Sequence, residues 1–91
     1  MNRVSGYRPE DLSNYIDWVF IHMKGRPYRL LHIATHSETG ETVVVYQALY
    51  GVFDVYVRPI DSFNAEVSLT DPKNTAGNTY RFQPCSDSHC D

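Results

Sequence analysis

A hairpin pattern in the middle of the chain constrains its fold more than any other feature. Thr42 to Leu49 contains Val43-Val44-Val45-Tyr46, a run of residues that favour β-strands. The segment before it, Glu38-Thr-Gly-Glu41, has a glycine where a tight turn needs a left-handed residue, and residues 28–35 have the composition of a strand. These two strands are therefore predicted to form an antiparallel hairpin.

Shorter segments on both sides extend this hairpin into a sheet. We expect strands over 18–23, 54–58 and 79–83, separated by turns that contain Gly, Pro and Asn. A proline followed by two carboxylates begins a predicted helix over about 9–17, and the apolar spacing in 60–67 predicts one or two helical turns. The sequence thus predicts a mainly β fold, a small antiparallel SH3-like barrel of about five strands with a short N-terminal helix and a short helical insertion.

Ninety-one residues suit a single small domain. We expect the β-barrel domain to span residues 19–83. An N-terminal extension over 1–18 holds the short helix, and residues 84–91 are expected to form a flexible tail because they contain almost nothing to bury.

The tail holds three residues that can ligate a metal, Cys85, His89 and Cys90. Structural zinc normally takes four ligands in two well-separated pairs, so this crowded set does not predict a metal site. Free thiols in a disordered tail are the first expectation, and a disulfide is the alternative.

Alternation along the predicted strands divides their side chains between two faces. We expect the valine-rich face to be the core, which assigns to it Leu31, Ile33, Val43, Val45, Leu49, Val55, Val57, Phe63 and Phe82. The opposite face of the same strands then gathers Tyr46, Tyr50, Tyr56 and Arg58 outside the core.

Tyrosine rings beside an arginine form a candidate ligand-binding surface. The rings of Tyr46, Tyr50 and Tyr56 can stack on a planar group, and the guanidinium of Arg58 can pair with a phosphate or a carboxylate through two hydrogen bonds. The alternative is structural: Arg58 braces the hairpin turn and the tyrosines cover the sheet.

His36 and Glu38, at the hairpin turn, complete the set of candidate ligand-binding residues. His36-Ser37-Glu38 does not suit a catalytic triad, because adjacent residues at a strand end point to opposite faces. We therefore assign no catalytic residue. The sequence also lacks a glycine-rich phosphate loop and a dinucleotide fingerprint, so no cofactor is expected.

Charge and hydropathy exclude several kinds of partner. The net charge is −3 and the 8 Lys and Arg residues are scattered, whereas a nucleic-acid-binding domain carries a basic stripe. No segment approaches the roughly 18 consecutive apolar residues of a membrane span. The first residues lack the apolar core of a secretory signal, so we expect a cytoplasmic protein that binds neither nucleic acid nor membrane.

Six short motifs together resemble a bacterial family of unknown function, number sixteen fifty-three in its series. They are Phe20-Ile-His22-Met-Lys24-Gly25, His36-Ser37-Glu38-Thr39, Val44-Val45-Tyr46-Gln-Ala-Leu49-Tyr50, Tyr56-Val57-Arg58-Pro59, Phe63 and Arg81-Phe82, and the match covers about residues 19–83. The chain departs from the family pattern where Phe20-Ile21 replaces an aromatic-arginine pair and where Tyr56 replaces a tryptophan. The resemblance implies a compact, mostly β domain of bacterial or phage origin. Fusion of some members to nucleotide-handling enzymes implies an accessory or ligand-sensing role.

These observations predict a non-enzymatic binding module for a small anionic or nucleotide-like molecule. The alternative is a protein-interaction module, such as a phage-encoded regulator or inhibitor of a host enzyme. In that case the tyrosines and Arg58 would anchor an interface, since Tyr and Arg are enriched in binding hot spots.

Overall fold

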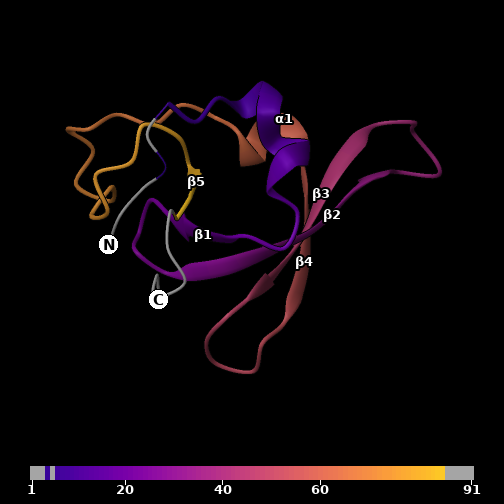
Figure 1. The fold of residues 1–91 in the computed structure, drawn as a ribbon, viewed down its shortest axis with the longest axis horizontal. Coiled ribbons are helices and arrows are strands. Elements are labelled where there is room, and N and C mark those ends of the chain that lie inside the picture. Colours follow the sequence, from indigo (N-terminus) through magenta and orange to yellow (C-terminus); the bar gives the residue numbers. More distant parts are fainter. Residues whose placement is uncertain (1–3, 5, 86–91) are drawn as a thin grey trace.

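A computed structural model describes residue 4 and residues 6–85 of the chain (Figure 1). The strands are antiparallel and, apart from β2, short, and the helical segments are brief. In chain order the elements are the 3-10 helix η1 (Pro9–Tyr15), β1 (Val19–His22), β2 (Pro27–Thr35), β3 (Thr42–Ala48), β4 (Val55–Pro59), α1 (Ile60–Phe63) and β5 (Phe82–Pro84).

The strands form one sheet in the order β4-β3-β2-β1-β5, with every neighbouring pair antiparallel. The predicted mainly β fold of about five strands is confirmed. The sheet bends strongly, and the β2–β3 and β3–β4 hairpins extend in different directions (Figure 1). β4 and β5 lie at its two edges, so the sheet is open and the term barrel describes it only loosely. The predicted N-terminal helix is the 3-10 helix η1, and the predicted insertion is the single turn α1.

A bulge in β2 sets which residues of this long strand face the core. Leu30 pairs with Tyr46, but the next paired residue, His32, lies opposite Val45, so the register shifts at Leu31. Leu30 before the bulge and Ile33 after it, which lies opposite Val44, therefore lie on the same face of the sheet.

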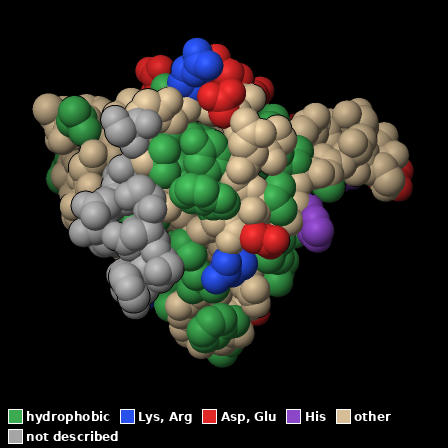
Figure 2. Space-filling view, in the orientation of Figure 1, with side chains coloured by type: hydrophobic (Ala, Val, Ile, Leu, Met, Phe, Trp, Pro, Cys, Tyr) green, Lys and Arg blue, Asp and Glu red, His purple; other side chains and the backbone are tan. Residues whose placement is uncertain are grey.

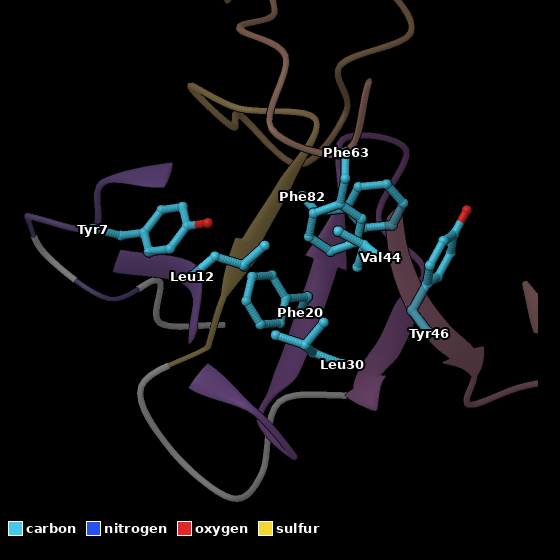
Figure 3. Packing of buried hydrophobic residues seen from close by; sticks show 8 residues of the cluster. All are labelled: Tyr7, Leu12, Phe20, Leu30, Val44, Tyr46, Phe63 and Phe82. Carbon is cyan, nitrogen blue, oxygen red and sulfur yellow. The ribbon is translucent and has the colours of Figure 1, made fainter. Parts of the chain in front are cut away.

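The core lies on the concave face of the sheet, beneath η1 and α1. The rings of Phe63 and Phe82 stack with centroids 4.2 Å apart, and Phe20 packs 5.6 Å from Phe63. Figure 3 shows these rings with the other buried members of the cluster, Tyr7, Leu12, Leu30, Val44 and Tyr46. Tyr7 and Leu12 belong to this cluster, so the N-terminal segment contributes directly to the core.

The predicted assignment of the two strand faces is wrong. Val55 and Val57 are 53% and 61% exposed, whereas Tyr46 is only 5% exposed. Apolar residues line both faces of these strands, so their pattern does not select the buried face. The Phe63 and Phe82 rings pack against the face that holds Tyr46, and this packing makes it the core. The burial predicted for Val43, Phe63 and Phe82 is confirmed, and Leu31, Ile33, Val45 and Leu49 are half-buried.

The loop between α1 and β5 covers part of the convex face. The buried Asn78 donates from Nδ2 to the Ile21 carbonyl oxygen at 2.8 Å, and Asn74 donates to the Asn78 carbonyl oxygen at 2.8 Å. Ile21 and Cys85 form a second small cluster against which Ala76 packs. This loop covers the β1–β5 side of the sheet, while Val55 and Val57 of β4 stay exposed on the same convex face.

The chain remains ordered beyond the predicted end of the domain. β5 includes Pro84, whose carbonyl oxygen accepts from the Val4 backbone nitrogen at 2.9 Å. Cys85 is 3% exposed and its sulfur takes part in a disulfide, so the expectation of a free thiol is wrong at this position. His89 and Cys90 lie outside the described residues.

Candidate functional site

A cleft with a volume of about 560 Å³ is lined by two tyrosines and three basic side chains: His22, Lys24, Arg26, Tyr28 and Tyr50. His22 ends β1, Lys24 and Arg26 belong to the β1–β2 turn, Tyr28 lies in β2, and Tyr50 follows β3. Gly25 adopts a φ of 95° and donates its backbone N–H to the His22 carbonyl oxygen. This left-handed residue closes the turn that carries the two cations.

The two tyrosines of the cleft bind each other. Their hydroxyl oxygens lie 2.5 Å apart, and their rings meet edge to face at 5.5 Å. Burial, and then the hydrogen bond to Tyr50, raise the pKa of the Tyr28 hydroxyl, which therefore stays protonated at neutral pH. The guanidinium carbon of Arg26 lies 4.7 Å from the centroid of the Tyr50 ring, a cation–π contact that holds this charge over the cleft.

His22 is neutral at physiological pH. Burial lowers its pKa to about 4, and the positive charges of Arg58, Lys24 and Arg81 contribute in that order. Its Nδ1 accepts from the Lys24 backbone N–H at 3.1 Å, so the proton of the neutral ring resides on Nε2. The cleft therefore contains a ring N–H donor that carries no charge of its own.

Two arginines converge on one serine next to this cleft. Arg58 Nη1 donates to Ser62 Oγ at 3.1 Å, and Arg81 Nη1 donates to the same oxygen at 2.8 Å. Arg58 also donates from Nε to the Tyr46 hydroxyl at 3.1 Å, and its guanidinium lies over the Phe82 ring. His22 contacts that same ring at 4.8 Å, so a single aromatic side chain separates the arginines from the cleft. We call Arg58, Arg81 and Ser62 the arginine pair site.

The structure brings together four of the residues that we predicted as ligand-binding. The Tyr46 and Tyr56 rings lie 5.9 Å apart, Arg58 binds Tyr46, and Tyr28 links Tyr46 to Tyr50 through edge-to-face contacts. Figure 3 shows the Tyr46 ring at the border of the core with its hydroxyl directed away from the cluster. Tyr46 is therefore a core residue whose polar end holds Arg58.

His36 and Glu38 lie in the β2–β3 turn and make local contacts there. His36 Nδ1 accepts from the backbone N–H groups of Glu38 and Thr39 at 3.1 and 3.4 Å. These hydrogen bonds give His36 a structural role in shaping the turn.

Sequence reasoning missed most of the side chains that surround the site, namely His22, Lys24, Arg26, Tyr28, Ser62 and Arg81. A signal for two of them was present, because Phe20 with His22 and Tyr28 with Leu30 alternate in the same way as Val44 and Tyr46 of β3. Arg81 and Ser62 meet across 19 positions of the chain, and no local pattern indicates that contact.

The chemistry available at the site is recognition of an anion. Its lining supplies cations, a neutral ring N–H and two phenolic hydroxyls, and no carboxylate. In the part of the chain that the structure describes, the ion pair present joins Arg8 and Asp11, remote in sequence from the site. Across the same residues, no cluster of His, Cys, Asp and Glu side chains could hold a metal ion.

Comparison with known proteins gives a match to a family model. No curated protein and no solved structure matches the chain. Among the described residues, no helix is long and apolar enough to cross a membrane. A family model described as protein of unknown function DUF1653 matches residues 19–84, a range that begins with β1 and ends with β5. The chain therefore belongs to this family of proteins of unknown function.

Proposed function

We propose that the protein is a non-enzymatic binding module that takes a small anionic molecule with an aromatic ring. The observation that carries the proposal is the cleft of about 560 Å³ lined by Tyr28, Tyr50, His22, Lys24 and Arg26. Clefts of roughly 300–1,000 Å³ suit small molecules. Aromatic walls stack on a planar ring, and the cations attract its negative charge.

The charge balance of the cleft supports an anion over a neutral ligand. Like charges near each other repel, and no carboxylate in the cleft lining offsets Lys24 and Arg26. His22 stays neutral in this field and therefore adds a hydrogen-bond donor without further repulsion. A bound anion would relieve the repulsion, and this relief favours binding.

Native mass spectrometry of the protein purified from its own host tests the proposal directly. We expect a retained anionic small molecule, and we expect Arg26→Gln to lose it. Arg29→Gln is the matched control, because it removes a cation from the opposite face of the same strand region, where Arg29 donates to the Asp17 carbonyl oxygen. Equal retention by all three proteins, or no retained molecule in the parent protein, would contradict the assignment of this cleft.

A second candidate function, a protein-interaction module, is favoured by the exposed apolar residues of β4 and its hairpin. Val52, Phe53, Val55 and Val57 are 83%, 51%, 53% and 61% exposed. Figure 2 shows a hydrophobic patch over the tip of the β3–β4 hairpin, at the lower end of the view. β4 is also an edge strand, so an extended segment of a partner could add to the sheet there.

The hydrogen-bond phase of β4 gives this second candidate a sharp test. The Ala48 N–H donates to the Asp54 carbonyl oxygen, and every second residue of β4 after Asp54 also forms its backbone hydrogen bonds with β3. Val57 lies between two of these residues, so its backbone N–H faces the free edge of the sheet. Val57→Pro removes this outward donor and is compatible with an edge strand, whereas Val57→Thr keeps it. In the same native spectra, a protein partner that Val57→Thr retains and Val57→Pro loses would support strand addition. A partner that both variants retain would refute it.

A further inference from the structure

The arginine pair site places two positive charges close together, and neither forms an ion pair with a carboxylate of the described residues. Both Nη1 atoms donate to Ser62 Oγ, at 3.1 and 2.8 Å, so the two nitrogens lie within about 6 Å of each other. Asp61, the neighbour of Ser62 in α1, is exposed and forms no ion pair with either arginine, and all three residues of the site are half-buried. Two guanidinium groups at this separation repel each other, and partial burial limits the screening by water.

The described residues do not use the full hydrogen-bonding capacity of this site. The Ser62 hydroxyl accepts from both arginines, and its own proton has no acceptor among the described residues. Arg58 uses Nε and Nη1, and Arg81 uses Nη1 alone, which leaves further N–H groups on both forks. The unused groups are all donors, so a ligand that fits this site is an acceptor with several oxygens.

We propose that Arg58, Arg81 and Ser62 bind the phosphoryl group of a phosphorylated ring compound whose ring occupies the adjoining cleft. A phosphate monoester supplies several acceptor oxygens and up to two negative charges, which match two guanidinium forks and a hydroxyl. A carboxylate supplies one charge and two oxygens, and it would leave part of the repulsion in place. This inference rests on the proposed function and deepens it, because it names the anionic group of the ligand and the residues that hold it.

The placement of the site supports a connection with the cleft. The Phe82 ring lies between the arginine pair site and the cleft, because it contacts Arg58 and also contacts His22 and Tyr28, which line the cleft. The charges of Arg58 and Arg81 both act on the His22 ring, which is consistent with a short separation. A nucleotide-sized molecule could therefore reach both parts of the site.

Inorganic phosphate probes the arginine pair site alone. In two-dimensional NMR of labelled protein at constant ionic strength, we expect phosphate to shift the Nε–H resonances of Arg58 and Arg81 saturably, with chloride as the control anion. Ser62→Ala should weaken this binding about threefold to tenfold, whereas Ser68→Ala, an exposed serine of the loop before β5, should leave it unchanged. The absence of a saturable shift at both arginines would overturn the inference, even if native mass spectrometry shows a different anion in the cleft.

AMP and adenosine separate the contribution of the phosphoryl group from that of the ring. We expect AMP to bind the parent protein at least about tenfold more tightly than adenosine. In Arg81→Gln we expect AMP to bind no more tightly than adenosine, whose weaker affinity should stay unchanged. Arg81→Lys is a second variant that keeps the charge should the first one fail to fold, and it should reduce the ratio because an ammonium lacks the planar fork. Equal affinities of AMP and adenosine for the parent protein would overturn the phosphoryl assignment while leaving the proposed cleft in place.

Discussion

Two valines on opposite faces of the sheet provide the most direct test of how this fold is stabilised. Val44 in β3 is fully buried against the aromatic core, and Val57 in the adjacent β4 is 61% exposed. Threonine has nearly the shape of valine and a similar preference for strands, so Val→Thr at either position changes polarity with little change of volume. The difference in stability between the two variants therefore measures the effect of burial.

The expected difference follows from the environment of each methyl group. At Val44 the change removes one buried methyl, worth about 0.8 kcal/mol, and buries a hydroxyl at a cost of roughly 1–3 kcal/mol. The loss of about 2–4 kcal/mol corresponds to a fall in Tm of roughly 10–20 °C for a domain of this size. Val57→Thr should stay within about 0.5 kcal/mol of the parent, as surface substitutions usually do.

Thermal unfolding followed by circular dichroism at several protein concentrations measures both variants. The reasoning fails if Val57→Thr lowers Tm as much as Val44→Thr does. A loss at Val57 that grows with protein concentration would mean that another chain covers this face in solution. A loss independent of concentration would mean that the core lies on the face that holds Val57.

Two further predictions concern pH and the loop before β5. The pKa of His22 is about 4 in the folded protein against its ordinary value of 6.5, so the unfolded state binds more protons between these values and stability falls as pH drops through that range. We expect His22 to contribute about 1–2 kcal/mol to the free energy of unfolding at pH 7, discounted for solvent screening. This contribution should disappear in His22→Asn, whose Oδ1 can still accept from the Lys24 N–H. Chemical denaturation at pH 4 and 7 measures the contribution, and an unchanged pH dependence in the variant would refute the assignment. Asn78→Ala should destabilise the fold by about 1–2 kcal/mol because it removes a buried amide that donates to the Ile21 carbonyl oxygen; Thr79→Ala, an exposed neighbour, is the control, and equal small effects would contradict this role.

The positions of the strands along the chain could be predicted from the sequence because strand and turn preferences act locally. Val43-Val44-Val45-Tyr46 favours a strand whichever face is buried, and Gly40 with a φ of 74° permits the tight turn before it. The same run is apolar on both faces, so alternation within it cannot select the core. Phe63 and Phe82 make that selection, and they are distant from β3 in sequence.

The bulge at Leu31 shows a second reason why faces were harder to predict than strands. One extra residue in β2 reverses the alternation of side chains after Leu30. In a regular strand His32 would share a face with Leu30, whereas in this strand Ile33 does so. Nothing in Arg29-Leu30-Leu31-His32 distinguishes a bulged strand from a regular one. The position of the bulge follows from pairing with β3, which is a tertiary interaction.

The part of the candidate site that lies on adjacent strands could be predicted from the sequence, and the rest could not. Tyr46, Tyr56 and Arg58 lie on adjacent strands, so their proximity follows from the register of one hairpin. The error in the faces changed the meaning of this group, because Tyr46 is a core residue whose hydroxyl holds Arg58. Arg81 and Ser62 join the group through contacts over long sequence separation, which the sequence pattern does not contain.

β4 places the two candidate functions on opposite faces of one strand, and this arrangement makes them separable by mutation. Tyr56 and Arg58 point toward the aromatic and basic face, while Val55 and Val57 point toward the exposed convex face. Val57→Pro changes a side chain on the convex face and removes a backbone donor that faces away from β3, so it removes none of the hydrogen bonds of Arg58, and Arg26 lies in a different turn. Loss of a small molecule with Arg26→Gln and loss of a protein partner with Val57→Pro are therefore independent outcomes. If each variant lost both partners, the two faces would have to be coupled through the β3–β4 hairpin.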